Sequence, residues 1–201
     1  MRDKIITILI ITILCACSDN KETLYHQNGN IKAIGEMVDG KRENEWVYFF
    51  ENGDTLEVSN FSNDRRHGKS YGFNNNVVKS LSKYNNGVME GERIMYYPNN
   101  QILAIGGMKD NKQHGKWKVY YDNGQIQNEF SMEDGNQVGA FTTYYRNGQI
   151  ESKSNDGIAN GIAEYYDSLG NLGWKIRFEN AQPKDTIEYN FSAPPLPENV
   201  N

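Results

Sequence analysis

The feature of this chain that most limits its fold is a sequence unit repeated about seven times. Two series of small turn residues, mostly glycine, run along the chain in phase, each with steps of 22 to 24 residues. Two locked series with this period indicate one supersecondary unit copied along an axis, so the length of 201 residues counts repeats rather than globular domains. The first series is Gly29, Gly53, Asn76, Asn100, Gly124, Gly148 and Gly170, and the second is Asn44, Gly68, Gly91, Gly115, Gly139 and Gly161.

Each repeat is predicted to contain two β-strands. Large apolar side chains follow Gly115 at every second position, at Trp117, Val119 and Tyr121, and strand side chains alternate between the two faces of a sheet. The chain also has 19 glycines, 12% aromatic residues and only five prolines, a composition that suits short strands and tight turns. We therefore expect an all-β fold, an elongated single-sheet solenoid of consecutive antiparallel β-hairpins.

An Asn-Gly dipeptide separates the two strands of several repeats, as at Asn123-Gly124. Both residues tolerate a positive φ, so the dipeptide predicts a hairpin turn. Asn75-Asn76 and Asn99-Asn100 replace it in two repeats. Asparagine adopts a positive φ with a modest strain that glycine does not have, so we expect looser turns there. Segments such as 38–41 and 133–136 are predicted to form the turns between hairpins.

The best-formed repeat reads Gly-Lys-Trp-x-x-Tyr-Tyr-x-Asn-Gly-Gln-Ile over residues 115–126, and a degenerate copy lies at 139–150. This pattern resembles the MORN-repeat variant of bacterial proteins of the YwqK antitoxin type. The resemblance covers residues 24–180 and implies an elongated, twisted sheet of MORN-like hairpins whose function is mainly binding. The repeat at 71–76 has lost one residue of the pattern, and the repeat at 165–172 has gained one.

Residues 1–16 have the features of a bacterial signal peptide. Two basic residues precede an apolar run at 5–14, which is too short to span a bilayer as a mature helix. The segment Leu14-Cys15-Ala16-Cys17 that follows resembles the lipobox of bacterial lipoproteins. The resemblance implies cleavage before Cys17 and lipidation of Cys17, with residues 17–23 as a polar tether.

Two other interpretations of this segment stay open, which are secretory cleavage without a lipid and a metal site at Cys15 and Cys17. Two thiols alone do not complete a tetrahedral site, and His26 lies outside any ligand spacing. Two or more acyl chains would anchor the chain stably in a membrane. We therefore expect a lipid-anchored protein of the cell envelope and favour the outer membrane, on its periplasmic or surface face.

The charge balance and the lack of catalytic motifs restrict the partners. The net charge is −5, whereas nucleic-acid binding requires a basic face. His67 and His114 occupy the same repeat position, so they are predicted to be turn residues rather than members of a metal site. The sequence has no nucleophile elbow and no phosphate-binding loop. We expect no enzymatic activity, no cofactor, no metal and no nucleic-acid partner.

Adjacent aromatic pairs such as Tyr120-Tyr121 recur along the chain. Neighbours in a strand point to opposite faces, so both faces should carry an aromatic row, and one of the rows belongs to the core. The second row either packs across strands without a ligand or forms a surface for a protein partner, since tyrosine is enriched in interfaces. This candidate binding stripe consists of Phe49, Tyr96, Tyr120 and Tyr144.

Residues 181–201 differ in character from the repeats. A linker at 181–185 precedes an alternating segment at 186–191, which is predicted to be a capping strand, and a proline-rich tail follows. The tail is either unstructured or a polyproline ligand.

Three functions remain open from the sequence. The leading one is a lipid-anchored cell-envelope scaffold that binds a protein partner. An antitoxin or immunity role rests on the family resemblance alone. The third is a structural envelope protein that binds glycan through its tyrosine and asparagine rows.

Overall fold

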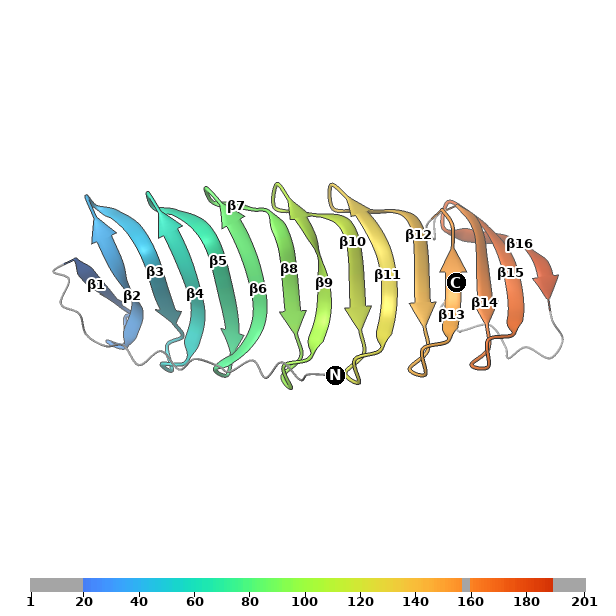
Figure 1. Cartoon of the computed structure of the whole chain (residues 1–201), viewed down its shortest axis with the longest axis horizontal. Helices are drawn as coiled ribbons and strands as arrows, with labels where there is room; N and C mark the ends of the chain where they lie inside the picture. The colour runs from blue at the N-terminus through green and yellow to red at the C-terminus, as the bar shows by residue number, and fades with distance from the viewer. Residues whose placement is uncertain (1–19, 157–159, 190–201) are drawn as a thin grey trace, which may run out of the picture.

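The fold is one open antiparallel β-sheet in which consecutive hairpins follow one another along a single axis (Figure 1). The computed structural model describes residues 20–156 and 160–189. Apart from β7, which lies beside the path, each strand pairs with the next one in the chain, so the predicted all-β, single-sheet solenoid is confirmed. In the described residues no helix has the length and apolarity needed to cross a membrane. The strands are β1 (Lys21–Tyr25), β2 (Ile31–Val38), β3 (Lys41–Phe49), β4 (Thr55–Ser62), β5 (Arg65–Asn74), β6 (Val77–Asn85), β7 (Val88–Met89), β8 (Gly91–Tyr96), β9 (Ile102–Lys109), β10 (Lys112–Tyr120), β11 (Ile126–Glu133), β12 (Asn136–Tyr144), β13 (Ile150–Ser154), β14 (Gly161–Tyr166), β15 (Leu172–Glu179) and β16 (Gln182–Tyr189).

The two ends of the sheet lie close to the limits of the described residues. β1 begins at Lys21, inside the 17–23 segment assigned above to a tether, and β7 pairs only with β6 beside the main path. β16 contains Pro183 and is an edge strand, where a missing backbone N–H need not break a ladder bond. Cys17, the signal segment and the proline-rich tail lie outside the described residues.

The Asn-Gly turns have a different geometry from the predicted one. Gly124 has a φ of +84°, whereas Asn123 is not at a positive φ. The Gly124 N–H donates to the Tyr121 carbonyl at 2.9 Å, and the Tyr121 N–H donates to the Gln125 carbonyl at 2.8 Å, as in a type I turn followed by a left-handed glycine. The Asn123 Oδ1 accepts a hydrogen bond from the Gln125 N–H at 3.1 Å. Asparagine therefore serves here through its side-chain acceptor rather than through a positive φ.

The expectation of a looser turn at Asn75-Asn76 is wrong, because this turn is the tighter one. Asn75 and Asn76 have φ values of 47° and 58° and connect β5 directly to β6. Two successive left-handed residues make a two-residue hairpin, which accounts for the residue that this repeat has lost. The turns between hairpins use the same geometry, for example at Asp134 (φ 50°) and Gly135 (φ 85°).

Hydrogen bonds join successive turns along both edges of the sheet. On the Asn-Gly edge, Asn123 Nδ2 donates to the Arg146 carbonyl of the next repeat at 3.3 Å, and Asn147 Nδ2 donates to the Ser168 carbonyl at 2.9 Å. On the opposite edge, the Gly135 N–H donates to the Gln113 carbonyl at 3.0 Å. Each repeat is therefore fixed to its neighbour at both ends of its strands, in addition to the strand ladder.

One face of the sheet, which we call the tryptophan face, holds two matching core clusters. Trp46 and Trp117 are 1% and 2% exposed, and their Nε1 atoms donate to the Glu36 and Gly107 carbonyls at 3.0 and 3.1 Å. Each ring lies flat on a glycine of the preceding strand: a Cβ on Gly35 would come within 2.2 Å of Trp46, and a Cβ on Gly106 within 2.1 Å of Trp117. A single-layer sheet thus buries an indole ring because the neighbouring strand has no side chain at that point.

Candidate binding surface

The opposite face, which we call the ladder face, carries a continuous central row with one side chain from each main-path strand between β1 and β15. Each member of the row is the direct register partner of the next, from β1 to β15. The row runs through Thr23, Ile34, Val47, Val58, Tyr71, Leu81, Ile94, Ile105, Lys118, Glu129, Thr142, Lys153, Glu164 and Lys175.

The central row changes character between β9 and β10. From Ile34 to Ile105 every member is apolar or aromatic and half-buried, and in the described part of the chain no second layer covers the sheet. From Lys118 onward the row consists of charged residues, with Thr142 between them. We call β1–β9 the apolar half and β10–β16 the charged half.

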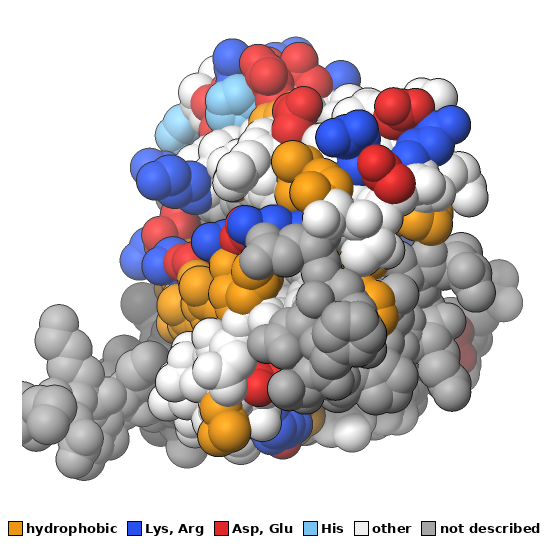
Figure 2. Space-filling model, turned by 90° about the vertical axis from the view of Figure 1, so that its right-hand side faces the viewer, with side chains coloured by type: hydrophobic (Ala, Val, Ile, Leu, Met, Phe, Trp, Pro, Cys, Tyr) orange, Lys and Arg blue, Asp and Glu red, His pale blue; other side chains and the backbone are white. Residues whose placement is uncertain are grey.

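In the charged half, the lysines of the central row are paired with neighbouring glutamates. Lys118 Nζ lies 2.8 Å from Glu129, and Lys153 Nζ lies 2.8 Å from Glu164. Hydrogen bonds from these lysines lower the pKa of the Glu129 and Glu164 carboxyls below their ordinary range. Figure 2, which views the β16 end, shows acidic and basic side chains mixed over the upper part of the described surface. The charged half of the row therefore satisfies its own charges.

The four residues of the predicted binding stripe all lie on the ladder face, at the end of strands β3, β8, β10 and β12. Each is the register partner of the first residue of the following strand, as Tyr120 is of Ile126. All four are half-buried, so the stripe borders the central row on its Asn-Gly side. The stripe residues are Phe49, Tyr96, Tyr120 and Tyr144.

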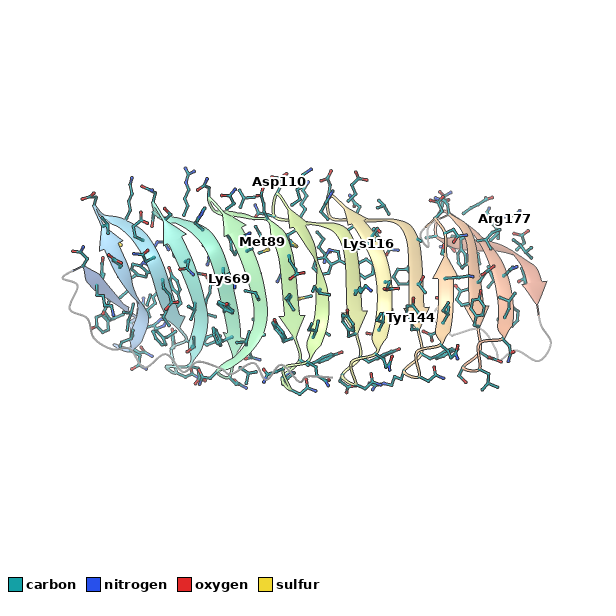
Figure 3. All side chains as sticks on the ribbon, viewed as in Figure 1. Lys69, Met89, Asp110, Lys116, Tyr144 and Arg177 are labelled. Atoms are coloured by element: carbon teal, nitrogen blue, oxygen red, sulfur yellow. The ribbon has the colours of Figure 1, made fainter. Side chains whose placement is uncertain are left out.

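The stripe differs between the two halves of the sheet. The Tyr144 hydroxyl donates to Glu129 Oε2 at 2.8 Å, and burial together with this bond raises the pKa of Tyr144 to about 12. Figure 3 shows Tyr144 near the Asn-Gly end of β12. Phe49 and Tyr96 instead border the apolar row, and burial raises the pKa of Tyr96. Tyr144 is thus committed to a bond within the sheet, whereas Phe49 and Tyr96 extend an apolar surface.

The second tyrosine of each aromatic pair has a structural role. The hydroxyls of Tyr97, Tyr121 and Tyr145 each donate to a main-chain carbonyl one repeat further along, at 2.8 Å in all three cases. His26 Nε2 contacts the Phe49 carbonyl at 3.0 Å in the equivalent position. These side chains join repeats and are not available to a ligand.

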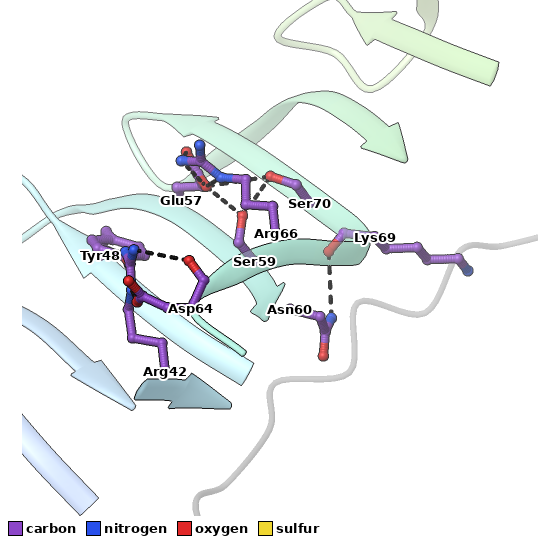
Figure 4. Close-up of polar contacts among 9 residues, drawn as sticks. All are labelled: Arg42, Tyr48, Glu57, Ser59, Asn60, Asp64, Arg66, Lys69 and Ser70. Carbon is purple, nitrogen blue, oxygen red and sulfur yellow. Dashed lines mark hydrogen bonds and ion pairs between the residues drawn. The ribbon is translucent and has the colours of Figure 1, made fainter. Parts of the chain in front are cut away.

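A polar network on the tryptophan face is a second candidate site (Figure 4). Ser59 and Ser70 are buried and bonded to each other at 2.6 Å, and Ser59 also donates to Glu57. Arg66 forms an ion pair with Glu57 at 2.8 Å. The members satisfy one another, as expected for a polar group of the sheet interior, so the network supports structure rather than binding.

Two hollows also occur on the described sheet. A hollow of about 440 Å³ opens between β6 and β8, lined in part by His67, Lys83 and Glu90. A second hollow of about 230 Å³ lies over β10–β12, beside Lys118 and Glu129. No group of three or more His, Cys, Asp or Glu side chains that could hold a metal occurs in residues 20–156 and 160–189.

Comparison with protein families gives three matches to the MORN repeat variant, at residues 89–110, 113–134 and 137–155. The matches cover less than half of the chain. These three segments run from β7 to β13 and follow the hairpins of the sheet. The sequence predicts the repeats and places the four stripe residues on one face, but it does not predict the central row. The signal was present in positions such as Val47 between Trp46 and Tyr48, where both faces of one strand are apolar.

Two known structures show distant likenesses to this chain, and no curated protein matches it. The Glycosylation Associate Protein (Gap123) complex from Streptococcus agalactiae shares 15% identity over 53% of this chain and 20% of that chain, with a TM-score of 0.34. The TcdB2-TccC3-Cdc42 complex shares 13% identity over 78% of this chain and 12% of that one, with a TM-score of 0.18. The chain thus spans a fifth or less of these larger proteins.

Proposed function

We propose that this chain is a lipid-anchored scaffold of the cell envelope, which holds a protein partner on the apolar half of its ladder face. One observation carries the proposal, namely the unbroken apolar row from Ile34 to Ile105 on an uncovered face of the described sheet. A contiguous apolar patch on a single-layer protein marks an interaction site more often than a free surface. Phe49 and Tyr96 widen the patch with the aromatic character that protein interfaces favour.

Two matched variants test the binding surface. Leu81→Glu places a charge in the apolar half of the central row, and Thr142→Glu places the same charge in the charged half of the same row. Crosslinking in intact cells, followed by identification of the captured protein, should lose the partner in Leu81→Glu and keep it in Thr142→Glu. Equal capture by both variants, or equal loss, would remove the apolar half as the binding surface.

The lipid anchor is tested separately at Cys17. Cys17→Ala should move the chain from the membrane fraction to the soluble fraction of cells, because the acyl chains would be missing. Unchanged fractionation would exclude lipid anchoring at this residue while leaving the binding surface untouched. The antitoxin role and the glycan-binding role stay predictions of the sequence.

A further inference from the structure

Two rows flank the central row in the apolar half, and both have an internal symmetry about β4. The first, which we call the charged row, lies two residues from the central row on the side away from the Asn-Gly turns. From β1 to β8, without β7, it reads basic, acidic, acidic, neutral, basic, basic, acidic. When the row is read in the opposite direction about β4, every basic position becomes acidic and every acidic position becomes basic. The charged row is Lys21, Glu36, Glu45, Asn60, Lys69, Lys83 and Glu92.

The second flanking row contains the apolar part of the predicted stripe, and we call it the aromatic row. It lies two residues from the central row on the Asn-Gly side. Its residue types are the same when read in either direction about β4, with Leu56 at the centre. The aromatic row is Tyr25, Lys32, Phe49, Leu56, Phe73, Lys79 and Tyr96.

Three charged members of this row, Lys69, Lys83 and Glu45, have no ion-pair partner in the described residues, whereas Glu36 accepts a hydrogen bond from Asn44 Nδ2 at 2.6 Å. Lys69 and Lys83 are direct register partners in β5 and β6, and like charges in that position destabilise a sheet. In Figure 4 the Lys69 side chain extends away from the polar network, and the Lys69 carbonyl accepts a hydrogen bond from Asn60 Nδ2 at 3.3 Å. In the charged half, the lysines of the central row form ion pairs with glutamates of the same chain. Lys69, Lys83 and Glu45 form no such pair, so they are free to pair with charges of a second molecule.

A second copy of the same chain carries charges that match this row. If two ladder faces meet about a two-fold axis that runs parallel to the strands over β4, each row lies over its own reversed copy. Lys69 then faces Glu45, Lys83 faces Glu36, and Lys21 faces Glu92 of the other copy. The same operation places Val58 over Val58 and Phe49 over Phe73. A surface that is complementary to itself in this way is what an isologous two-fold interface requires.

The geometry and the area also suit two sheets packed face to face. The axis keeps the strands of the two copies aligned, as in the aligned class of sheet packing. Seven strands about 4.8 Å apart and about 25 Å long give a footprint of roughly 850 Å² per copy. Doubled, that area falls within the roughly 1,200–2,000 Å² of stable interfaces. Lys32 and Lys79 form the one like-charged match, and both are exposed, so their long side chains can extend into solvent.

We propose that the ladder face of β1–β6 and β8, within the apolar half, is the interface of a two-fold symmetric homodimer, with β4 at the axis. The inference rests on the proposed function, because it identifies the partner of the same surface as a second copy of the chain. The acidic residues that flank Lys69 and Lys83 in the charged row, Glu45 and Glu92, disfavour an anionic membrane as the alternative occupant.

Reversal of charges tests the dimer. The full chain is kept in mild detergent, so that its apolar N-terminal segment does not drive association, and its mass is measured by sedimentation equilibrium. Lys69→Glu alone and Glu45→Lys alone each turn two symmetry-related attractive pairs into repulsive ones. Each should weaken the dimer about tenfold or more. Lys69→Glu removes a like-charged pair within the sheet, so loss of the dimer would not arise from unfolding.

Restoration is the decisive result. The double variant Lys69→Glu/Glu45→Lys should dimerise again, and an equimolar mixture of the two single variants should form a mixed dimer. A foreign partner with fixed charges would not be recovered by either operation. Lys116→Glu is the matched control, because this exposed lysine continues the same row on β10, beyond the seven strands of the interface (Figure 3), and it should leave the dimer unchanged.

Three outcomes would overturn the inference: a monomeric wild-type chain, single variants as dimeric as wild type, or single variants that do not recover on mixing. A monomer whose capture of another protein in cells still depends on Leu81 would leave the proposed function in place. A dimer that is unaffected by Leu81→Glu and by both charge-reversal variants would use a different interface and overturn the inference.

Discussion

Strands β3 and β10 occupy the same position in two repeats, and they agree on one face of the sheet and differ on the other. On the tryptophan face, Trp46 and Trp117 are buried to the same extent over a glycine and donate to equivalent carbonyls. On the ladder face, the next residue is Val47 in β3 and Lys118 in β10. In these two repeats the tryptophan face is therefore the same, whereas the ladder face differs between the halves and can carry function.

The largest effect is expected when either of the two indole rings is removed. Trp46→Ala and Trp117→Ala should each destabilise the chain by about 4 kcal/mol, because both delete a buried side chain and leave a cavity. Urea unfolding measures the two losses. If Trp117→Ala had a much smaller effect than Trp46→Ala, the two tryptophan clusters would not be equivalent, and the halves would differ on both faces.

The next test adds a methyl group beneath each ring. Gly35→Ala and Gly106→Ala should each cost about 2 kcal/mol through overpacking, because the added Cβ would lie 2.2 Å from Trp46 or 2.1 Å from Trp117. Thermal unfolding followed by tryptophan fluorescence measures this loss and any shift of the indole. Gly29→Ala is a control with an open Cβ position, although its φ of +86° adds backbone strain. A loss in Gly35→Ala no larger than in Gly29→Ala would contradict ring-on-glycine packing.

The sequence predicts the tryptophan face better than the ladder face for a physical reason. Repeat spacing and alternation are local signals, and they give the hairpins, the single sheet and the face shared by Trp117 and Val119. The row from Ile34 to Ile105 depends on the register across many strands. The bulges at successive strand pairs set this register, and no single repeat contains that information.

The same limit applies to individual site residues. The sequence places Phe49, Tyr96, Tyr120 and Tyr144 on one face, and the structure agrees. It could not separate Tyr144, whose hydroxyl bonds to Glu129, from Tyr96, which borders apolar neighbours. That distinction depends on Glu129, which lies 15 residues from Tyr144 in the sequence. The sequence does not show whether a turn asparagine has a positive φ or serves as a side-chain hydrogen-bond acceptor, because both roles favour asparagine.

Alkaline titration sharpens the contrast within the stripe. The pKa of Tyr144 is raised from its ordinary value of 10.0 to about 12. A group with a raised folded pKa contributes stability below its unfolded pKa and loses that contribution as the pH rises through the folded value. We therefore expect a loss of about 1 kcal/mol between pH 10 and about 12, after allowance for solvent screening. Ultraviolet absorbance of tyrosinate should lose a high-pH component in Tyr144→Phe, and an unchanged curve would exclude the Glu129 contact.

Acid pH should destabilise the charged half more than the apolar half. This is the smallest of the expected effects. The pKa values of Glu129 and Glu164 lie below the ordinary 4.5 because of hydrogen bonds from Lys118 and Lys153. The stability that these two carboxylates contribute is therefore present above pH 4.5, and it is lost as the pH falls through their lower pKa values in the folded state. These pairs are partly exposed, so we expect about 0.5 kcal/mol from each. Urea unfolding at neutral and acid pH should show a flatter pH dependence in Glu129→Gln/Glu164→Gln than in the wild type, whereas Glu51→Gln, in an exposed turn of the apolar half, should leave it unchanged. If Glu51→Gln flattened the pH dependence of stability equally, the ion pairs of Glu129 and Glu164 would not distinguish the two halves.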